Sequence, residues 1–163
     1  MNHAILLVSG NNPVLQRYKA HLEQAGYSIR IARNLFEAEV ELRATLFSLV
    51  ITDLRMWDSD LTEGLKVIER VRTLRMGMPI LARAGSGDLG LHRKARELGV
   101  FDVMAEDMPL VDLAFLVANL LDEMYNPGAA PPPPPSNGGT LPNGTSGHMV
   151  RPHHAKKLVP GSE

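Results

Sequence analysis

The sequence predicts an α/β fold, a doubly wound sheet of five parallel strands with helices on both faces. Five short apolar runs alternate with five stretches of helical periodicity in the first 126 residues or so. Two of the runs, AILLVS and SLVITD, are nearly continuous in hydrophobic residues, as expected for parallel strands that are buried on both faces. The strict alternation of strand and helix favours a parallel sheet over an antiparallel one.

The first half of the chain contains three of the predicted strands. The first strand covers residues 4–8, and a helix follows at 13–25, with Asn12 as its expected N-cap and Pro13 at its first position. The second strand and helix are predicted for residues 27–31 and 35–46. The third strand, residues 48–52, is the most hydrophobic, and Asp53 follows it directly. We therefore expect Asp53 at the mouth of a central strand.

The second half completes the alternation. A third helix is predicted for residues 61–74, a fourth strand for 79–82 and a fourth helix for 89–98, with Gly99 just beyond its end. The fifth strand is predicted for residues 100–104, and the last helix, 110–124, has one apolar stripe formed by Leu113, Leu116, Val117, Leu120 and Leu121.

The composition changes near Asn126. Residues 127–163 are rich in Pro, Gly, Ser and Asn and include five consecutive prolines at 131–135. Such a segment buries too little apolar surface to offset its ordering entropy. We predict one domain at residues 1–126 and a disordered tail at 127–163, which serves as a linker or as a ligand for grooves that recognise polyproline.

The bulk composition excludes several classes of function. The net charge is −1, so nothing in the charge favours direct binding to nucleic acid or to an anionic membrane. The chain contains no cysteine, which rules out disulfides and thiol chemistry. No apolar run approaches the roughly 18 residues of a membrane helix. We expect a cytoplasmic protein with no membrane association.

The predicted strand ends indicate where a site should lie. In a doubly wound sheet, ligands bind beyond the carboxyl ends of the strands. The turn after the first strand contains Gly10 and Asn11, and the fourth and fifth strands lead into Arg83 and Glu106. Asp53 is the carboxylate of the central strand, and it is interpreted either as a functional acid or as a residue that stabilises a turn.

The order and spacing of these pieces resemble a known family. Residues 1–126 resemble the receiver domain of two-component response regulators, which has a flavodoxin-like or CheY-like (βα)5 fold. The resemblance rests on ILLVSGNNPVLQRYKAHLEQAGYSIRIARN, FSLVITDLRM, GLKVIERVRTLRMGMPIL and ARELGVFDVM. It implies that Asp53 is the phosphoacceptor. It also implies that a divalent metal is held by Asp53, by the backbone carbonyl of Arg55, and by acidic residues at the two positions that Gly10 and Asn11 occupy in this chain.

The chain departs from the family pattern at most of these positions. Gly10 and Asn11 stand where the resemblance implies acids, and Arg83 or Ala84 stands where it implies a hydroxyl. Glu106 replaces the implied lysine, and Asp107 the following proline. Mg²⁺ prefers carboxylates and waters. We therefore expect a degenerate pseudo-receiver without a cofactor, in which Asn11, Asp53 and the Arg55 carbonyl are the only residual metal ligands.

Two hypotheses concern what replaces the metal. Arg83 enters the vacated pocket and pairs with Asp53, or it is exposed to solvent. The acids Asp58, Asp60 and Glu63 are expected to stabilise the start of the third helix rather than to bind a metal. Trp57 is interpreted either as an anchor for a partner or as a side chain that folds over the pocket.

We expect an interaction module rather than an enzyme, acting in a two-component or phosphorelay pathway without standard Mg²⁺-dependent phosphorylation. The expected partner is a histidine kinase or an effector protein, contacted through Trp57, His92, Arg96 and Phe101. A homodimer through the fourth–fifth strand and helix face is a further expectation. The alternatives are an active phosphoacceptor at Asp53 and, less favoured because the first turn is no phosphate cradle, a small-ligand or flavin-binding domain.

Overall fold

The computed structural model describes residues 2–57 and 62–128. Strands and helices alternate throughout these residues. The strands are β1 (Ala4–Val8), β2 (Ser28–Ala32), β3 (Leu49–Asp53), β4 (Ile80–Ala84) and β5 (Asp102–Ala105). The helices are α1 (Asn12–Gln24), α2 (Leu35–Ala44), α3 (Glu63–Leu74), α4 (Leu89–Glu97) and α5 (Leu110–Tyr125). Every predicted element is present, with ends that differ by at most two residues.

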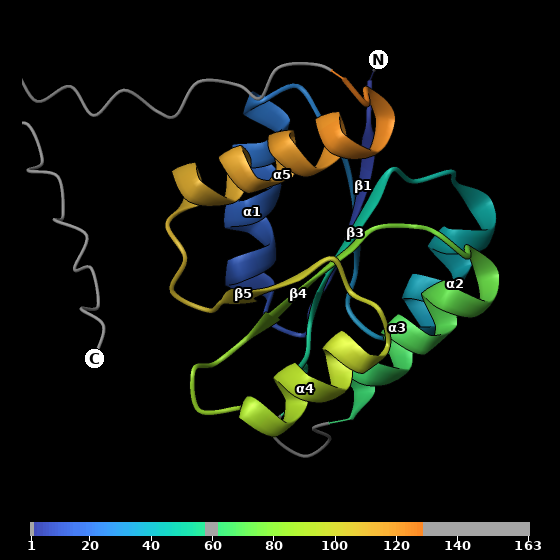
Figure 1. Ribbon diagram of the computed structural model, residues 1–163, viewed down its shortest axis with the longest axis vertical. Helices are drawn as coiled ribbons and strands as arrows, with labels where there is room; N and C mark the ends of the chain where they lie inside the picture. The colour runs from blue at the N-terminus through green and yellow to red at the C-terminus, as the bar shows by residue number, and fades with distance from the viewer. Residues whose placement is uncertain (1, 58–61, 129–163) are drawn as a thin grey trace, which may run out of the picture.

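The five strands form one parallel sheet in the order β2-β1-β3-β4-β5. Helices α1 and α5 cover one face, and α2, α3 and α4 cover the other (Figure 1). The predicted α/β class, with its doubly wound CheY-like topology, is thereby confirmed. Among the described residues, no helix is long and apolar enough to cross a membrane.

Alternating residues of the strands pack into two separate hydrophobic cores, one on each face of the sheet. Leu6, Val8 and Val50 pack toward α2, α3 and α4, whereas Ile5 and Ile51 pack toward α1 and α5. Since β1 and β3 are buried along nearly their whole length, the pattern of continuous hydrophobic residues has its physical explanation in this three-layer arrangement. The polar residues at the strand ends then lie where the two cores meet solvent.

Strand pairing continues past the apolar runs. Asp53 is the last residue of β3 and is paired in register with Arg83 of β4. The sequence prediction ended these two strands one and two residues too early, because it ended them where hydrophobicity ends. The backbone ladder continues instead, and Leu54 N–H donates to the Arg83 carbonyl at 2.8 Å. This register holds two oppositely charged side chains side by side.

The predicted tail at residues 127–163 lies almost wholly outside the described residues, of which Gly128 is the last. The last helix ends at Tyr125, close to the predicted domain boundary. The boundary at residue 126 and the character of the tail remain predictions.

Candidate functional site

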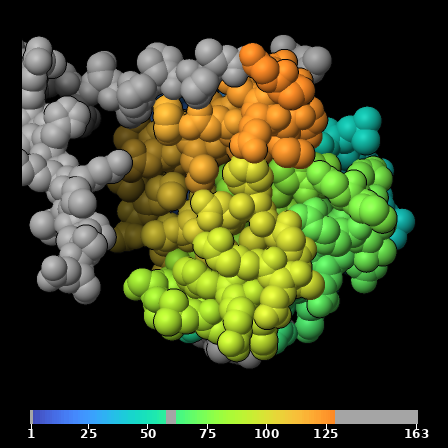
Figure 2. All heavy atoms as spheres, in the orientation of Figure 1, coloured from blue at the N-terminus to red at the C-terminus, as the bar shows by residue number. Residues whose placement is uncertain are grey.

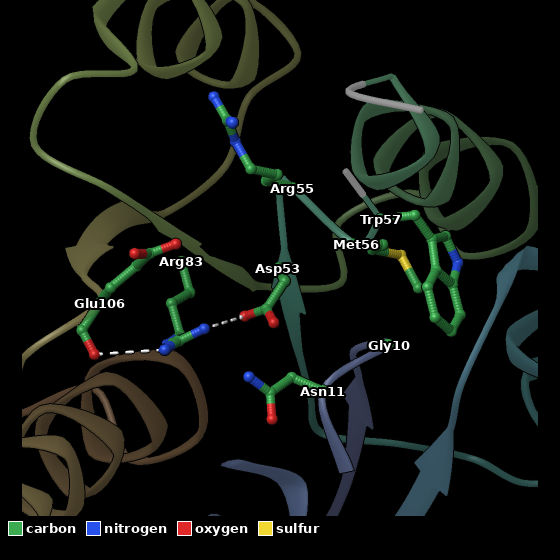
Figure 3. A pocket seen from close by; sticks show the side chains of 8 residues that line it. All are labelled: Gly10, Asn11, Asp53, Arg55, Met56, Trp57, Arg83 and Glu106. Atoms are coloured by element: carbon green, nitrogen blue, oxygen red, sulfur yellow. Dashed lines mark hydrogen bonds and ion pairs between the residues drawn. The ribbon is translucent and has the colours of Figure 1, made fainter. Parts of the chain in front are cut away.

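A cavity of about 460 Å³ lies at the carboxyl end of the sheet (Figure 3). It is lined by Gly10, Asn11, Asp53, Arg55, Met56, Trp57, Arg83 and Glu106. The structure thus brings together the five residues that the strand-end argument named and Arg55, which the family resemblance implied, and it adds Met56 and Trp57. They come from the ends of β3 and β4 and from the turns after β1, β3 and β5.

Asp53 is held by donors on both carboxylate oxygens. Its side chain is buried, and the residue is 6% exposed. The Ser9 hydroxyl donates to Oδ2, and Arg83 Nη1 donates to Oδ1 at 3.0 Å. Ser9 follows β1 directly, and β1 neighbours β3, so the sheet order explains this contact. Neither oxygen of the carboxylate is left without a protein donor.

Arg83 connects three parts of the site. Besides Asp53, its guanidinium donates through Nη2 to the Glu106 carbonyl at 3.2 Å. It also lies 5.9 Å from the centre of the Tyr18 ring, within the range of a cation–π interaction. The side chains of Arg83 and Asp53 are 11% and 8% exposed. The hypothesis of an Arg83–Asp53 pair therefore agrees with the structure, and the alternative of a solvent-exposed Arg83 is wrong.

The environment shifts the ionisation of both partners. Burial raises the pKa of the Asp53 carboxyl above its ordinary value, and the charge of Arg83 and the Ser9 and Arg83 hydrogen bonds only partly oppose this. Burial, the largest influence on Arg83, would lower its pKa, but attraction to Asp53, Tyr18 and Glu106 together outweighs burial and raises it. Arg83 thus remains a cation while Asp53 is the partner that acid can neutralise.

The other charged residues of the cavity point elsewhere. Arg55 turns away from Asp53 (Figure 3), and its Nη2 pairs with Asp88 Oδ1 at 2.5 Å. Glu106 is exposed, and its backbone rather than its carboxylate contacts Arg83. The carboxylate of Glu106 still raises the pKa of Asp53. The cavity therefore contains one buried ion pair with further charges at its rim.

Trp57 lies over the turn that follows β1. An ideal Cβ at Gly10 would meet the indole atoms Cε2 and Cζ2 of Trp57 at 3.0 Å and the Met56 carbonyl oxygen at 2.4 Å. Trp57 is nevertheless 45% exposed. The interpretation that Trp57 folds over the pocket is supported by this geometry, and the exposed part of the ring leaves its role as a partner anchor a prediction.

The residues present do not fit a magnesium ion. The Asn11 side-chain oxygen accepts the Val14 N–H at 3.3 Å, so Asn11 and not Asn12 is the N-cap of α1. Both Asp53 oxygens are engaged, one of them by a guanidinium cation. Within residues 2–57 and 62–128, no group of three His, Cys, Asp or Glu residues is arranged to hold a metal. A divalent cation would have to displace Arg83 and Ser9.

Among the acids after the third strand, the structure describes Glu63. Asp58 and Asp60 lie outside the described residues. Glu63 begins α3, as expected, but its carboxylate accepts the N–H of Leu35 at 3.1 Å. It therefore links the start of α3 to the start of α2.

The expected partner residues do not form a single patch. His92 Nε2 is 3.0 Å from the Gly85 carbonyl, and Arg96 pairs with Asp102 at 3.5 Å. Phe101 lies at the opposite end of the strands from Trp57, in a groove of about 420 Å³ that Met124 also lines. Their role in binding a partner remains a prediction.

The match to a family model decides the family. Residues 5–117 match the model described as the response regulator receiver domain. The chain belongs to this family. It is 26% identical over 105 residues to the photosynthetic apparatus regulatory protein RegA of Cereibacter sphaeroides. The matched segment covers 64% of this chain and 55% of RegA. It is 25% identical over 103 residues to the transcriptional regulatory protein DctD of Rhizobium meliloti, covering 63% of this chain and 22% of DctD.

Solved structures agree with this assignment. The receiver domain protein of Methanospirillum hungatei superposes with a TM-score of 0.71 at 25% identity, covering 78% of this chain and all of that one. The putative response regulator of Chloroflexus aurantiacus gives a TM-score of 0.67 at 27% identity, covering 74% and 98%. The chain spans about half or less of the two curated relatives.

Two residues of the site were missed from the sequence. Neither Ser9 nor Tyr18 is among the predicted pocket residues, yet the Ser9 hydroxyl donates to Asp53 and the Tyr18 ring lies beside the Arg83 guanidinium. The available signal was weak: Tyr18 is a polar group among the buried apolar residues of α1, and Ser9 directly follows the apolar strand β1.

Proposed function

We propose that this receiver domain is a protein-interaction module of a two-component pathway, in which Arg83 occupies the role that a metal ion and a phosphoryl group have in a switching receiver. One observation supports this proposal above the others. The phosphoacceptor position, Asp53, already forms a nearly buried ion pair with Arg83 at 3.0 Å. A cytoplasmic location and a histidine kinase or effector as partner belong to the same proposal.

A permanent pair would hold the domain in one state. Arg83 reaches from β4 to Asp53 on β3, to the backbone after β5 and to Tyr18 on α1. Transfer of a phosphoryl group is catalysed mainly by positioning and by neutralising the charge that develops. Arg83 already neutralises the charge of Asp53. Phosphorylation of Asp53 would therefore change the charge balance of the pocket less than in a receiver without this arginine. The partner would then recognise a constant surface.

The second candidate function is phosphorylation of Asp53 without the usual metal. The observation in its favour is that Asp53 and Arg83 both line the open cavity. Guanidinium binds phosphate as well as carboxylate. In this case Arg83 would release Oδ1 for attack and would then bind the phosphoryl oxygens.

Incubation of the full chain with a small acyl phosphate donor, with and without Mg²⁺, separates the two. Intact mass spectrometry reads the product, and a receiver that keeps its acids and lysine serves as the positive control. We expect no phosphoryl adduct on this chain under conditions that label the control fully. An adduct that Asp53→Asn abolishes would refute the proposal, and its dependence on Mg²⁺ would show whether a metal is used.

The surface of α4, β5 and α5 is the proposed contact for the partner or for a second copy of the chain. Figure 2 shows these elements together on one side, with the last turns of α5 next to the chain that enters β5. Sedimentation of the full chain over a range of concentrations tests the homodimer. Dissociation by Arg96→Glu would support it, and a monomer at all concentrations would exclude it.

A further inference from the structure

The turn after β3 lies across the turn after β1. These two strands are neighbours in the sheet, so the loops at their carboxyl ends meet. Met56 anchors the later turn, because it is 5% exposed and belongs to the core beneath α2, α3 and α4. Trp57 follows, and its indole lies on the backbone of Gly10 (Figure 3).

This contact requires glycine at position 10. A Cβ there would lie 2.4 Å from the Met56 carbonyl oxygen, a distance that real Cβ atoms essentially never show. It would also lie 3.0 Å from two atoms of the indole ring. Because a backbone oxygen cannot turn aside as a flexible side chain can, any larger residue would have to lift the 56–57 turn.

Position 10 is also one of the two positions at which the family resemblance places a metal-binding acid. We infer that Trp57 closes the cation position of this pocket and that Gly10 is the residue that admits it. The pocket thus excludes a divalent cation by shape, in addition to the loss of carboxylates and the presence of Arg83. This inference rests on the proposed function, but it makes a separate structural claim.

A double-mutant cycle between positions 10 and 57 tests it without metal or phosphate. Gly10→Ala, Trp57→Ala and the double variant are unfolded with urea in the full chain. If the indole holds the turn against Gly10, Gly10→Ala should lower the folding equilibrium constant of the native chain. In the Trp57→Ala background the same substitution should lower that constant by a factor about tenfold smaller. Additive effects of the two substitutions would overturn the inference. Trp57→Phe is the control, because it keeps a ring on Gly10 and should retain most of the coupling.

A second measurement asks whether the contact excludes the ion. Asn11→Asp and Arg83→Thr are combined in a chain that keeps Gly10, because a larger residue there would itself lift the 56–57 turn. This protein is compared with and without Trp57→Ala. Isothermal titration with Mg²⁺ should show at least about tenfold tighter binding when Trp57 is absent. Mg²⁺ loses its bound waters reluctantly, and the indole would leave no room for them. Equal affinities would mean that Trp57 does not close the site. Neither result depends on whether the native chain accepts a phosphoryl group, so the two proposals fail separately.

Discussion

Replacing Arg83 with methionine removes the cation from the buried pair while it keeps most of the side-chain volume. The Asp53 carboxylate, 8% exposed, would then retain its burial and the Ser9 hydrogen bond but lose its counter-charge. Breaking a buried pair by removing one partner costs roughly 3–5 kcal/mol. Since domains are stable by only about 5–15 kcal/mol, we expect a large loss in the free energy of unfolding.

The cost should depend on pH. Burial raises the pKa of Asp53 in the folded protein, and loss of Arg83 should raise it further. A carboxyl whose folded pKa exceeds its unfolded pKa binds its proton more tightly in the folded state. Its contribution to stability is therefore greatest below the unfolded pKa and is lost as pH rises through the folded pKa. The Arg83→Met variant should regain stability in mild acid by at most about 1.4 kcal/mol per pH unit.

Urea unfolding at neutral and mildly acidic pH measures both effects. Arg55→Met is the matched control, because Arg55 also pairs with an aspartate, at 2.5 Å, but its side chain is 40% exposed. That variant should lose about 0–1 kcal/mol. The double variant Arg83→Met with Asp53→Asn should recover much of the loss, because no unpaired charge remains buried. If Arg83→Met cost no more than Arg55→Met, the reasoning would be refuted.

Further predictions concern the frame of the site. Gly64→Ala should destabilise by roughly 1–3 kcal/mol or more, because its Cβ would lie 2.2 Å from the Asp53 carbonyl oxygen. Gly90 lies in α4, and a Cβ there would meet nothing within 4 Å, so Gly90→Ala should instead stabilise by about 0.5–1 kcal/mol. If urea unfolding showed that both glycine substitutions destabilise, or that both stabilise, the packing argument would be contradicted. Asn34→Ala should cost about 1 kcal/mol in thermal unfolding, since its side chain accepts the Glu37 N–H at 2.8 Å as the N-cap of α2. An unchanged melting temperature would exclude that capping role.

The fold could be predicted because its signal is burial. Strands such as β1 and β3 have buried residues along nearly their whole length, and that pattern is visible in the sequence. The ends were less predictable, because Asp53, Arg83 and Ala105 continue the backbone pairing after hydrophobicity has ended. The N-cap of α1 was wrong for a different reason: Asn11 and Asn12 are equally good capping residues, and only the backbone geometry selects Asn11.

The site could be predicted as a set of residues but not as a set of contacts. The rule that ligands bind at strand ends predicted most of the residues that line the cavity, Arg83 and Glu106 among them, but not Met56. It could not decide whether Arg83 faces Asp53 or solvent, since that depends on the register between β3 and β4. Nor could it find Tyr18, because a tyrosine at helical spacing looks like an ordinary core residue until the guanidinium lies over its ring.

The most direct test of the central claim is an amide NMR titration of the full chain with Mg²⁺ and then with beryllofluoride, which mimics a phosphoryl group on a carboxylate. The Asp53–Arg83 pair should remain, so we predict no saturable shifts of resonances near Asp53, Arg83 and Glu106 at millimolar metal. Saturable shifts at these residues would contradict the account, because they would show that the pocket still admits the cation and the phosphoryl mimic.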